Sequence, residues 1–551
     1  MASFSHLPAE LVEYIVNYLS QSDKYAFCRL NKALNQLAIP FLYRHVDLFI
    51  PPGNKLPRID RFCLNIINDS RTAGRVESIR LGLCSGEGVK EGQRWLPRDR
   101  HFNDEEMFDK AMNGLNNRIL FTAGIFLRNA IGMREYSSYA ALILLFLPSL
   151  RRLELADYKS ATFDHVHTVL SNLNKKNPWN RRHPSGAFID ALSHIKEVSL
   201  NIDRHSGVAY PRENSHYSLD HILHIMCIEK LEMSIPDGRN PIRRPLVSNF
   251  QQTNITTLII RHSGSLSEIL QLLLSCVPKL RSFTYEIHHD CGGKENTAPR
   301  LIDLPAWIDS LRQVRETLEI LVFSAEYCDT SKYFFAQPRI GDKFHGYLDL
   351  TSFERLHTLE APFPFLTGDV EFSITTEIYA LLPPNLRHLS LRPDLSHAQL
   401  PFPFDVSILP SALTFEESKT EAQHMMNARM DVSYMFQASL TLLDYAPDLE
   451  TISVWQPADA SLEWFDGQVA DFATTCKNKN VNGKIITPML LRRKKVEHRD
   501  LIKEVTVFDR VNPVRGHVEK FFRQEWEGRP LGLASQYHLH ALRSHMVQLH
   551  R

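Results

Sequence analysis

The residues best suited to chemistry are concentrated in the stretch His288-His289-Asp290-Cys291-Gly292-Gly293. Histidine, aspartate and cysteine are all metal ligands, so this stretch raises the question of a zinc site. Four adjacent residues cannot all point at one ion, and no second pair of ligands stands nearby at the spacing typical of zinc sites. We therefore expect a surface loop here, between a strand and the next helix, and we predict no metal and no other cofactor.

A catalytic cysteine would need to lie at the start of a helix and face a histidine. Cys276 instead lies at the end of an apolar stretch, Leu274-Ser275-Cys276-Val277-Pro278, and we expect its thiol to be packed inside. The sequence contains no Gly-x-Ser-x-Gly, no phosphate-binding loop, no His-Glu-x-x-His and no Gly-x-Gly-x-x-Gly that opens a helix. We predict no catalytic residue, and a protein that is not an enzyme but acts by binding.

Composition narrows the classes of partner. The 551 residues include 63 basic and 63 acidic side chains, so no net charge attracts the chain to nucleic acid or to an anionic membrane. The eight cysteines are scattered singly, which is typical of reduced thiols. The N-terminal residues lack a basic region followed by an apolar core, so we expect no secretory signal, and the most apolar run, residues 140–147, is too short to cross a membrane. We expect a cytoplasmic and/or nuclear protein without nucleic-acid or membrane partners.

The elements that must position any binding residue form a recurring unit. The pattern apolar-x-x-apolar-x-apolar, as in Leu150-Arg151-Arg152-Leu153-Glu154-Leu155, predicts a short strand. Copies begin at Val76, Leu150, Ile195, Ile228, Ile255, Leu280, Leu318, Leu356, Leu386 and Leu449. Amphipathic helices are predicted between copies, at Ser138–Leu147, Ser218–Met226, Ser265–Val277, Leu304–Val314, Thr376–Leu382 and Tyr434–Tyr445. A helix–turn–strand period of about 25 to 40 residues is similar to that of leucine-rich repeats, with uneven spacing and long insertions.

A doubly wound α/β domain is the alternative, because it also alternates strands with helices. The predicted strands are very short and follow a period of two, and no glycine-rich turn follows any of them, so we favour the repeat. His45–Phe49 is predicted to be an edge strand joined to the first copy. Beyond Trp455, we expect a last strand at Leu501–Phe508 and helices at Val518–Trp526 and Tyr537–Leu549, which would close the repeats as a cap.

The N-terminal stretch, residues 7–46, predicts three short helices. The first begins near Pro8, the second runs to Leu30, and Asn31 either stops the second or starts a third, which Pro40 ends. Three such helices bury too little surface to be stable alone. They therefore need a partner, either later in this chain or on another protein.

The motif Leu7-Pro8-Ala9-Glu10-Leu11, with the pattern that follows it, resembles the F-box. This resemblance implies that the helices dock on a Skp-type adaptor, which is attached to a cullin scaffold in a ubiquitin ligase. The residues expected to contact the adaptor are Leu7, Pro8, Glu10, Leu11, Ile15, Leu19 and Leu30.

The residues between the apolar positions of each strand must lie on the opposite face of the sheet, which is the concave face of a solenoid. Their mixed signs argue against a nucleic-acid groove and favour a protein target, whose identity the sequence leaves open. The residues expected to contact that target are Arg152, Glu154, Arg261, Glu286, His388, Arg392 and Trp455.

Together these patterns predict an α/β protein: an N-terminal three-helix F-box followed by an irregular leucine-rich-repeat-like α/β solenoid. The expected divisions are an F-box at 1–50, a linker at 51–73, the solenoid at 74–460 and a C-terminal repeat or cap region at 461–551. The expected function is the substrate-recognition subunit of a Skp–cullin–F-box ubiquitin ligase. A scaffold protein that binds the adaptor without a ligase, and a solenoid that binds a small molecule, remain the alternatives.

Overall fold

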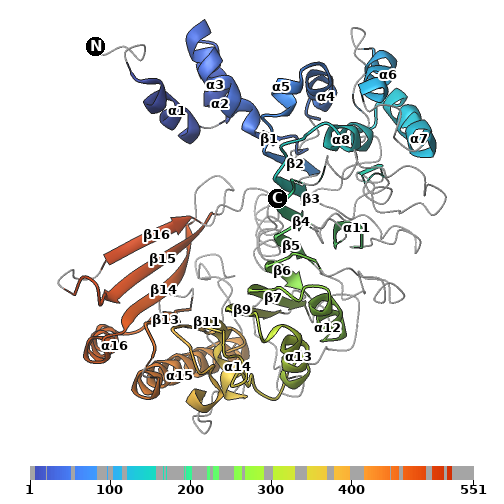
Figure 1. Ribbon diagram of the computed structural model, residues 1–551. Coiled ribbons are helices and arrows are strands. Elements are labelled where there is room, and N and C mark those ends of the chain that lie inside the picture. The colour runs from blue at the N-terminus through green and yellow to red at the C-terminus, as the bar shows by residue number, and fades with distance from the viewer. Residues whose placement is uncertain are drawn as a thin grey trace. The chain divides into compact units, whose positions relative to one another are not determined.

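The structure is a computed structural model of the chain (Figure 1). The residues it describes are 7–19, 21–50, 56–82, 96, 103–114, 121–156, 165–166, 169, 192, 194–201, 220–223, 227–234, 253–263, 267–290, 302–328, 344–368, 378–396, 415–446, 448–457, 463–491, 499–513 and 518–523. The chain divides into two compact units. Unit 1 comprises Met1–Met233 and Pro241–Asn254, and unit 2 comprises Ser234–Asn240 and Ile255–Arg551.

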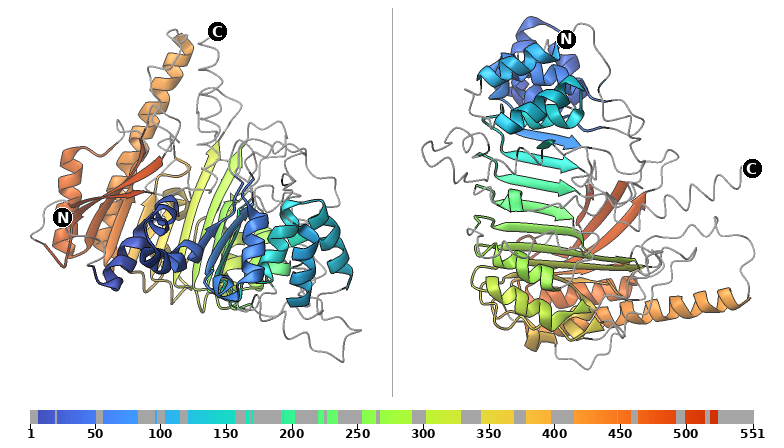
Figure 2. Two further views of the ribbon diagram at one scale, coloured as in Figure 1. Left: turned by 90° about the horizontal axis from the view of Figure 1, so that it is seen from above. Right: turned by 90° about the vertical axis from the view of Figure 1, so that its right-hand side faces the viewer.

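Unit 1 starts with three helices and continues into parallel strands. Its helices are α1 (Ala9–Tyr18), α2 (Gln21–Cys28), α3 (Lys32–Arg44), α4 (Ile59–Asn68), α5 (Ser70–Ala73), α6 (Asp104–Gly114), α7 (Phe121–Gly132), α8 (Tyr136–Leu144) and α11 (Asp220–Leu223). Its strands are β1 (His45–Asp47), β2 (Ser78–Gly82), β3 (Arg152–Ala156), β4 (Glu197–Asn201) and β5 (Lys230–Ser234). These strands pair in chain order and in parallel, as the right-hand view of Figure 2 shows.

Unit 2 repeats the same alternation and ends in an antiparallel ribbon. Its helices are α12 (Ser267–Ser275), α13 (Leu304–Leu311), α14 (Phe363–Thr367), α15 (Phe415–Tyr445) and α16 (Asp466–Lys479), with 3₁₀ turns η6 (Arg312–Val314) and η8 (Ile378–Leu381). Its strands are β6 (Thr257–Ser263), β7 (Ser282–Asp290), β8 (Ile302–Asp303), β9 (Ile320–Cys328), β10 (Phe344–His345), β11 (Thr358–Pro362), β12 (His388–Arg392), β13 (Thr451–Trp455), β14 (Asn482–Leu491), β15 (Arg499–Phe508) and β16 (Val518–Arg523). Strands β6, β7, β9, β11, β12, β13 and β14 pair in parallel in that order, and β15 and β16 add on antiparallel.

The α/β class and the strand pattern predicted from the sequence are confirmed. Each apolar-x-x-apolar-x-apolar copy contains one of the strands β2 to β7, β9 or β11 to β13, and the second and third apolar positions of each copy are buried. The edge strand expected after residue 45 is β1, which pairs with β2. The predicted helices correspond to α8, α11, α12, α13 with η6, η8 and the second half of α15.

The core of unit 2 is an aromatic cluster on the helix-facing side of its sheet. Phe283 and Tyr285 of β7 and Phe323 of β9 lie beneath Trp307 of α13 and Phe365 of α14. The ring centroids of Tyr285 and Trp307 are 5.5 Å apart, and those of Phe323 and Phe365 are 5.7 Å apart, both edge to face. Such pairs add stabilisation beyond the burial of their area, so the helices are fixed against the strands at this point.

Several expectations are wrong. Residues 59–73, expected to be linker, form α4 and α5, and Ile59 and Cys63 are buried because α4 is strongly amphipathic. The segment from Val518 is a strand, β16, which pairs with β15 instead of forming a helix. The segment Tyr537–Leu549 lies outside the described residues.

The third helix does not end at Pro40. Asn31 starts α3 as its N-cap, since its side chain accepts a hydrogen bond from the Leu34 N–H at 2.9 Å, and the helix continues through Pro40 to Arg44. A proline inside a helix removes one backbone hydrogen bond. Phe41 packs against the core of the N-terminal helices, and this burial offsets the loss.

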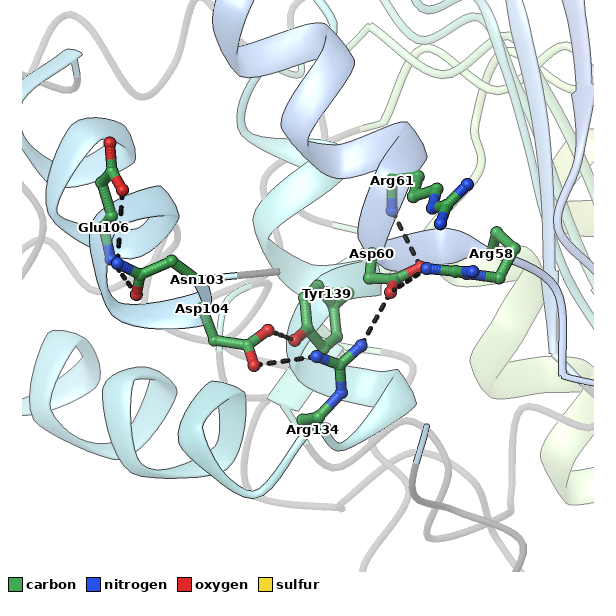
Figure 3. Close-up of polar contacts among 8 residues, drawn as sticks. All are labelled: Arg58, Asp60, Arg61, Asn103, Asp104, Glu106, Arg134 and Tyr139. Atoms are coloured by element: carbon green, nitrogen blue, oxygen red, sulfur yellow. Dashed lines mark hydrogen bonds and ion pairs between the residues drawn. The ribbon is translucent and has the colours of Figure 1, made fainter. Parts of the chain in front are cut away.

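A buried charge network joins the helices of unit 1 (Figure 3). The Arg134 guanidinium donates to Asp60 Oδ2 at 2.7 Å and to Asp104 Oδ2 at 2.9 Å, and Tyr139 donates its hydroxyl hydrogen to Asp104. Asp60 lies on α4, Asp104 begins α6, and Arg134 precedes α8. Arg58 forms a second ion pair with Asp60, at 3.1 Å. Helices that are distant in the sequence are therefore held together by one interdependent set of charges.

We predict that Asp60→Asn destabilises unit 1 by about 3–5 kcal/mol, because it leaves the buried Arg134 charge without one of its partners. Thermal or denaturant unfolding of the full chain measures this loss. Asp109→Asn is the matched control, since it breaks an exposed pair with Arg128 and should cost no more than about 1 kcal/mol. Equal losses in the two variants would contradict the role given to the network.

The network also predicts how stability depends on pH. Burial acts to raise the pKa of Asp60, but hydrogen bonds from Arg58 and the Arg61 amide, with the charges of Arg58 and Arg134, outweigh burial and hold that pKa below its usual value. The stabilisation is therefore complete above the unfolded pKa of about 3.9 and is lost as the pH falls through the lower folded value. The difference in melting temperature between wild type and Asp60→Asn should shrink below about pH 4, and a difference independent of pH would refute this.

Candidate protein-binding site

Helix α1 is apolar on two sides. Its inner side consists of Val12 and Val16, which are 2% and 0% exposed and pack into a small core with Phe27, Leu34 and Ala38. This core is what holds α1, α2 and α3 together. A helix in a small module normally has a polar outer side, so the composition of the opposite side of α1 is informative.

Large apolar side chains line the outer side of α1: Leu11, Tyr14 and Tyr18 lie on the helix, and Leu7 precedes it by two residues. The spacings of three and four residues place Leu11, Tyr14 and Tyr18 in one line along the helix, and Leu7 comes four residues before Leu11. Leu11 is 51% exposed and Tyr18 is 73% exposed. We call these four residues the outer row. Exposed apolar side chains that gather in this way, rather than lying scattered, mark an interaction site.

The second helix and its end extend the exposed apolar surface of this module. Tyr25 on α2 and Leu30 just beyond it are both exposed, Leu30 to 67%. The Arg29 guanidinium lies 5.9 Å from the centre of the Tyr25 ring. Aromatic residues and arginine are the types that most often dominate the binding energy of protein interfaces.

The outer row contains no acidic or basic side chain. The rings of Tyr14 and Tyr18 lie 4.9 Å apart, and a hydrogen bond with Tyr14 raises the pKa of Tyr18 above its ordinary value, with a smaller contribution from desolvation. The Tyr18 phenol is therefore neutral near pH 7. A partner would cover this row without having to desolvate a charge.

The residues predicted to contact an adaptor fall into two groups. The exposed ones are Leu7, Pro8, Glu10, Leu11 and Leu30. Ile15 and Leu19 are half-buried, and Leu19 packs against the core shared by the three helices. Tyr14, Tyr18 and Tyr25 are not among the residues predicted from the sequence to bind a partner. The spacing of four, three and four along α1 is the signal that identifies the two tyrosines of that helix.

The three helices are connected directly to the first strands. Helix α3 ends at Arg44 and β1 begins at His45, and the Arg44 side chain pairs with Glu77 at 3.0 Å. Beyond β1, the Leu48 N–H donates to the Arg80 carbonyl at 3.0 Å. The buried Tyr136 hydroxyl donates to the Leu48 carbonyl and accepts from the Gly82 N–H. Within unit 1, backbone and side-chain hydrogen bonds thus attach the three helices that bear the outer row to the first strands.

The residues predicted to contact a target lie on the face of the strands opposite the core. In unit 1, Arg152 is exposed and Glu154 lies 3.3 Å from Arg80. In unit 2, Arg261 and Glu286 form an ion pair at 2.5 Å, and His388 is half-buried with its pKa lowered chiefly by burial. Most of the charges on this face are therefore paired with one another.

One cluster on this face of unit 2 combines charge with an aromatic ring. The Arg392 guanidinium donates to Glu360 at 2.7 Å and to Asp394 at 2.8 Å, and it lies 4.5 Å from the centre of the Trp455 ring. The Trp455 indole N–H donates to Ser390 Oγ at 3.1 Å. Trp455 is thus held in one orientation by neighbouring strands and is half-buried, as in a preformed protein-binding anchor.

The stretch His288–Gly293 was expected to be a surface loop, and this expectation is wrong for its first three residues. Residues His288–Asp290 are not a loop, because β7 continues through them and stays paired with β9 as far as Cys328. Cys291 to Gly293 lie outside the described residues. Within the described part of the chain, no group of three or more histidine, cysteine, aspartate or glutamate residues is placed to hold a metal ion.

Five cysteines of the described part of the chain carry thiols and are not joined in disulfides. Cys28, Cys63, Cys276 and Cys476 are buried, and Cys227 is half-buried. Burial raises the pKa of Cys476 to about 12 and also raises that of Cys28, so these thiols stay protonated. Cys276 is packed as predicted, and its thiol donates to the Leu272 carbonyl.

Among the described helices, none combines the length and the apolarity that crossing a bilayer requires.

Comparisons with known proteins yield no family. No family model matches the chain, and no curated protein matches its sequence.

We predict that Leu34→Ala destabilises the first three helices far more than Leu11→Ala does, although both replace a leucine of these helices. Leu34 is buried, so its loss should cost about 2–5 kcal/mol, whereas exposed Leu11 should cost less than about 0.5 kcal/mol. Hydrogen exchange of the amides of α1 to α3 in the full chain measures the difference. Faster exchange in Leu11→Ala would show that the outer row serves the fold.

Proposed function

We propose that this protein is the substrate-recognition subunit of a Skp–cullin–F-box ubiquitin ligase. In this proposal, α1 to α3 are an F-box that docks on a Skp-type adaptor. The strands and helices that follow form an irregular leucine-rich-repeat-like solenoid that holds a target protein. No residue of this chain performs bond chemistry; the subunit raises the concentration of the target near the ubiquitin carrier that the ligase brings.

The observation that carries the proposal is the outer row on α1. Leu11, Tyr14 and Tyr18 of α1, with Leu7 just before it, remain exposed after the chain has folded, and the other side of the helix already supplies the core of the module. Covering apolar surface is favourable by roughly 25 cal/mol per Å², so a partner gains free energy by covering this row. The Leu-Pro-x-Glu-Leu motif at the start of the row resembles the motif with which F-box proteins bind their adaptor.

The connection between the helices and the strands supports the same function. A receptor that works by proximity must hold its target at a defined distance from the adaptor. The junction of α3 with β1, the Arg44–Glu77 ion pair and the Tyr136 hydrogen bonds restrict bending between the adaptor-binding helices and the first repeats.

The strand order supports a solenoid over a doubly wound domain. Apart from the separate short pair of β8 and β10, the parallel strands of each unit pair in the order of the chain, whereas a doubly wound sheet reverses its order near the middle. The solenoid face bearing Trp455 is the proposed target surface. We place the adaptor-binding site in unit 1, and we propose the cytoplasm and/or the nucleus as the compartment.

We predict that Leu11→Asp abolishes co-purification of the full chain with a purified Skp-type adaptor, because it places a charge in the centre of the outer row. Pro8→Ala combined with Leu11→Ala should have the same effect. The matched control is Met133→Asp, which places the same charge on an exposed apolar residue of unit 1 outside the three helices. Unchanged adaptor binding by Leu11→Asp, with the control behaving identically, would overturn the proposal.

Two further measurements separate the alternatives. If the adaptor binds and a cullin joins it in the same pull-down, the ligase is supported, whereas an adaptor complex that excludes the cullin would indicate a scaffold. A screen of small molecules by thermal shift tests whether the solenoid instead holds a metabolite. Stabilisation by one compound, with no adaptor binding, would favour that alternative.

A further inference from the structure

A row of polar residues crosses the first three strands of unit 1 next to the N-terminal helices. His45 of β1, Ser78 of β2 and Arg152 of β3 occupy consecutive register positions. Their neighbours Val46, Ile79 and Leu153 are buried, so the row lies on the face opposite the core. His45 Nδ1 lies 3.2 Å from Ser78 Oγ, and both His45 and Arg152 are exposed.

The charges that act on His45 are mainly positive. Arg44 at the end of α3, Lys24 on α2 and Arg152 all act on His45, and Glu77 is the opposing charge. Glu77 forms an ion pair with Arg44, in which Oε2 and Nε lie 3.0 Å apart. Arg152 forms no ion pair with another of the described residues. Farther along the same strands, Arg80 forms ion pairs with Asp47 at 3.5 Å and with Glu154 at 3.3 Å. These two carboxylates balance the Arg80 charge, so the positive region ends there.

We propose that His45, Ser78 and Arg152, in the field of Lys24 and Arg44, form a binding site for an oxyanion: the phosphoryl group or carboxylate of a bound protein segment. Arg152 supplies the charged donors, the Ser78 hydroxyl supplies a neutral donor, and protonated His45 supplies a further charged donor. The site goes beyond the adaptor-binding function, because it lies on strands and not on the outer row.

The titration of His45 supports this assignment. Desolvation lowers the pKa of His45, and Arg44, Lys24 and Arg152 lower it further against the opposing effect of Glu77. Glu197 of β4, next to Arg152 in register, is the next acidic group along the row. Lys24 responds to the same surroundings, since burial and then Arg44 lower its pKa. An oxyanion in the row would offset the three cations and raise the pKa of His45.

The test uses the full-length protein with ¹³C-labelled histidine, in which the His45 signal is assigned by its absence in His45→Gln. Inorganic phosphate, titrated at constant ionic strength, should raise the pKa of His45. Arg152→Ala should weaken phosphate binding about tenfold, whereas Arg71→Ala, which removes an exposed arginine outside the row, should leave binding unchanged.

Two peptides identify the source of the oxyanion. One carries phosphoserine, and the other carries aspartate at the same position. A response of His45 to the first alone assigns the site to phosphorylated segments, and a response to both assigns it to acidic segments in general. The proposal fails if phosphate leaves the pKa of His45 unchanged, or if Arg71→Ala weakens binding as much as Arg152→Ala.

Discussion

Most parallel strands of this protein are only about five residues long, and so short a strand persists only when it hydrogen-bonds to a neighbour in register. Register is therefore the constraint on which the rest depends. Shifting one strand by one residue would turn Leu153 outward and Glu154 into the core. Helices between strands, such as α8 before β3 and α13 before β9, supply buried residues to the apolar face, so that one unit of the pattern is incomplete until the next is added.

The same register arranges the polar face. Because neighbouring strands place opposite charges close together, Arg80 meets Glu154 directly across the ladder, Arg392 meets Glu360 diagonally, and Arg261 meets Glu286. Pairing of this kind reduces the net charge of the face and leaves few positions to attract an ion or a charged partner. Arg152 and its neighbours near His45 are an exception. Trp455, held by Arg392 and Ser390, differs by offering a fixed aromatic surface.

The N-terminal helices pose the opposite problem, because α1 has more apolar surface than its own core can cover. Val12 and Val16 are enough to pack α2 and α3, and the outer row remains exposed. Because exposed leucines and tyrosines gather in this row and do not lie scattered, we interpret the row as a docking surface. The buried Arg134 network adds rigidity nearby by fixing α4, α6 and α8 to one another.

The sequence by itself determined the local units. The ten apolar-x-x-apolar-x-apolar copies, the edge strand at His45 and the packed Cys276 followed from periodicity and burial, which act within a few residues. The sequence did not determine the features that depend on contacts with residues far away in the chain. The passage of α3 through Pro40, the strand at Val518 and the continuation of β7 through His288 are decided by packing or by pairing with segments elsewhere in the chain. Only the tertiary structure could show which side of α1 stays exposed, because both of its sides are apolar in the sequence and only one is used by the core.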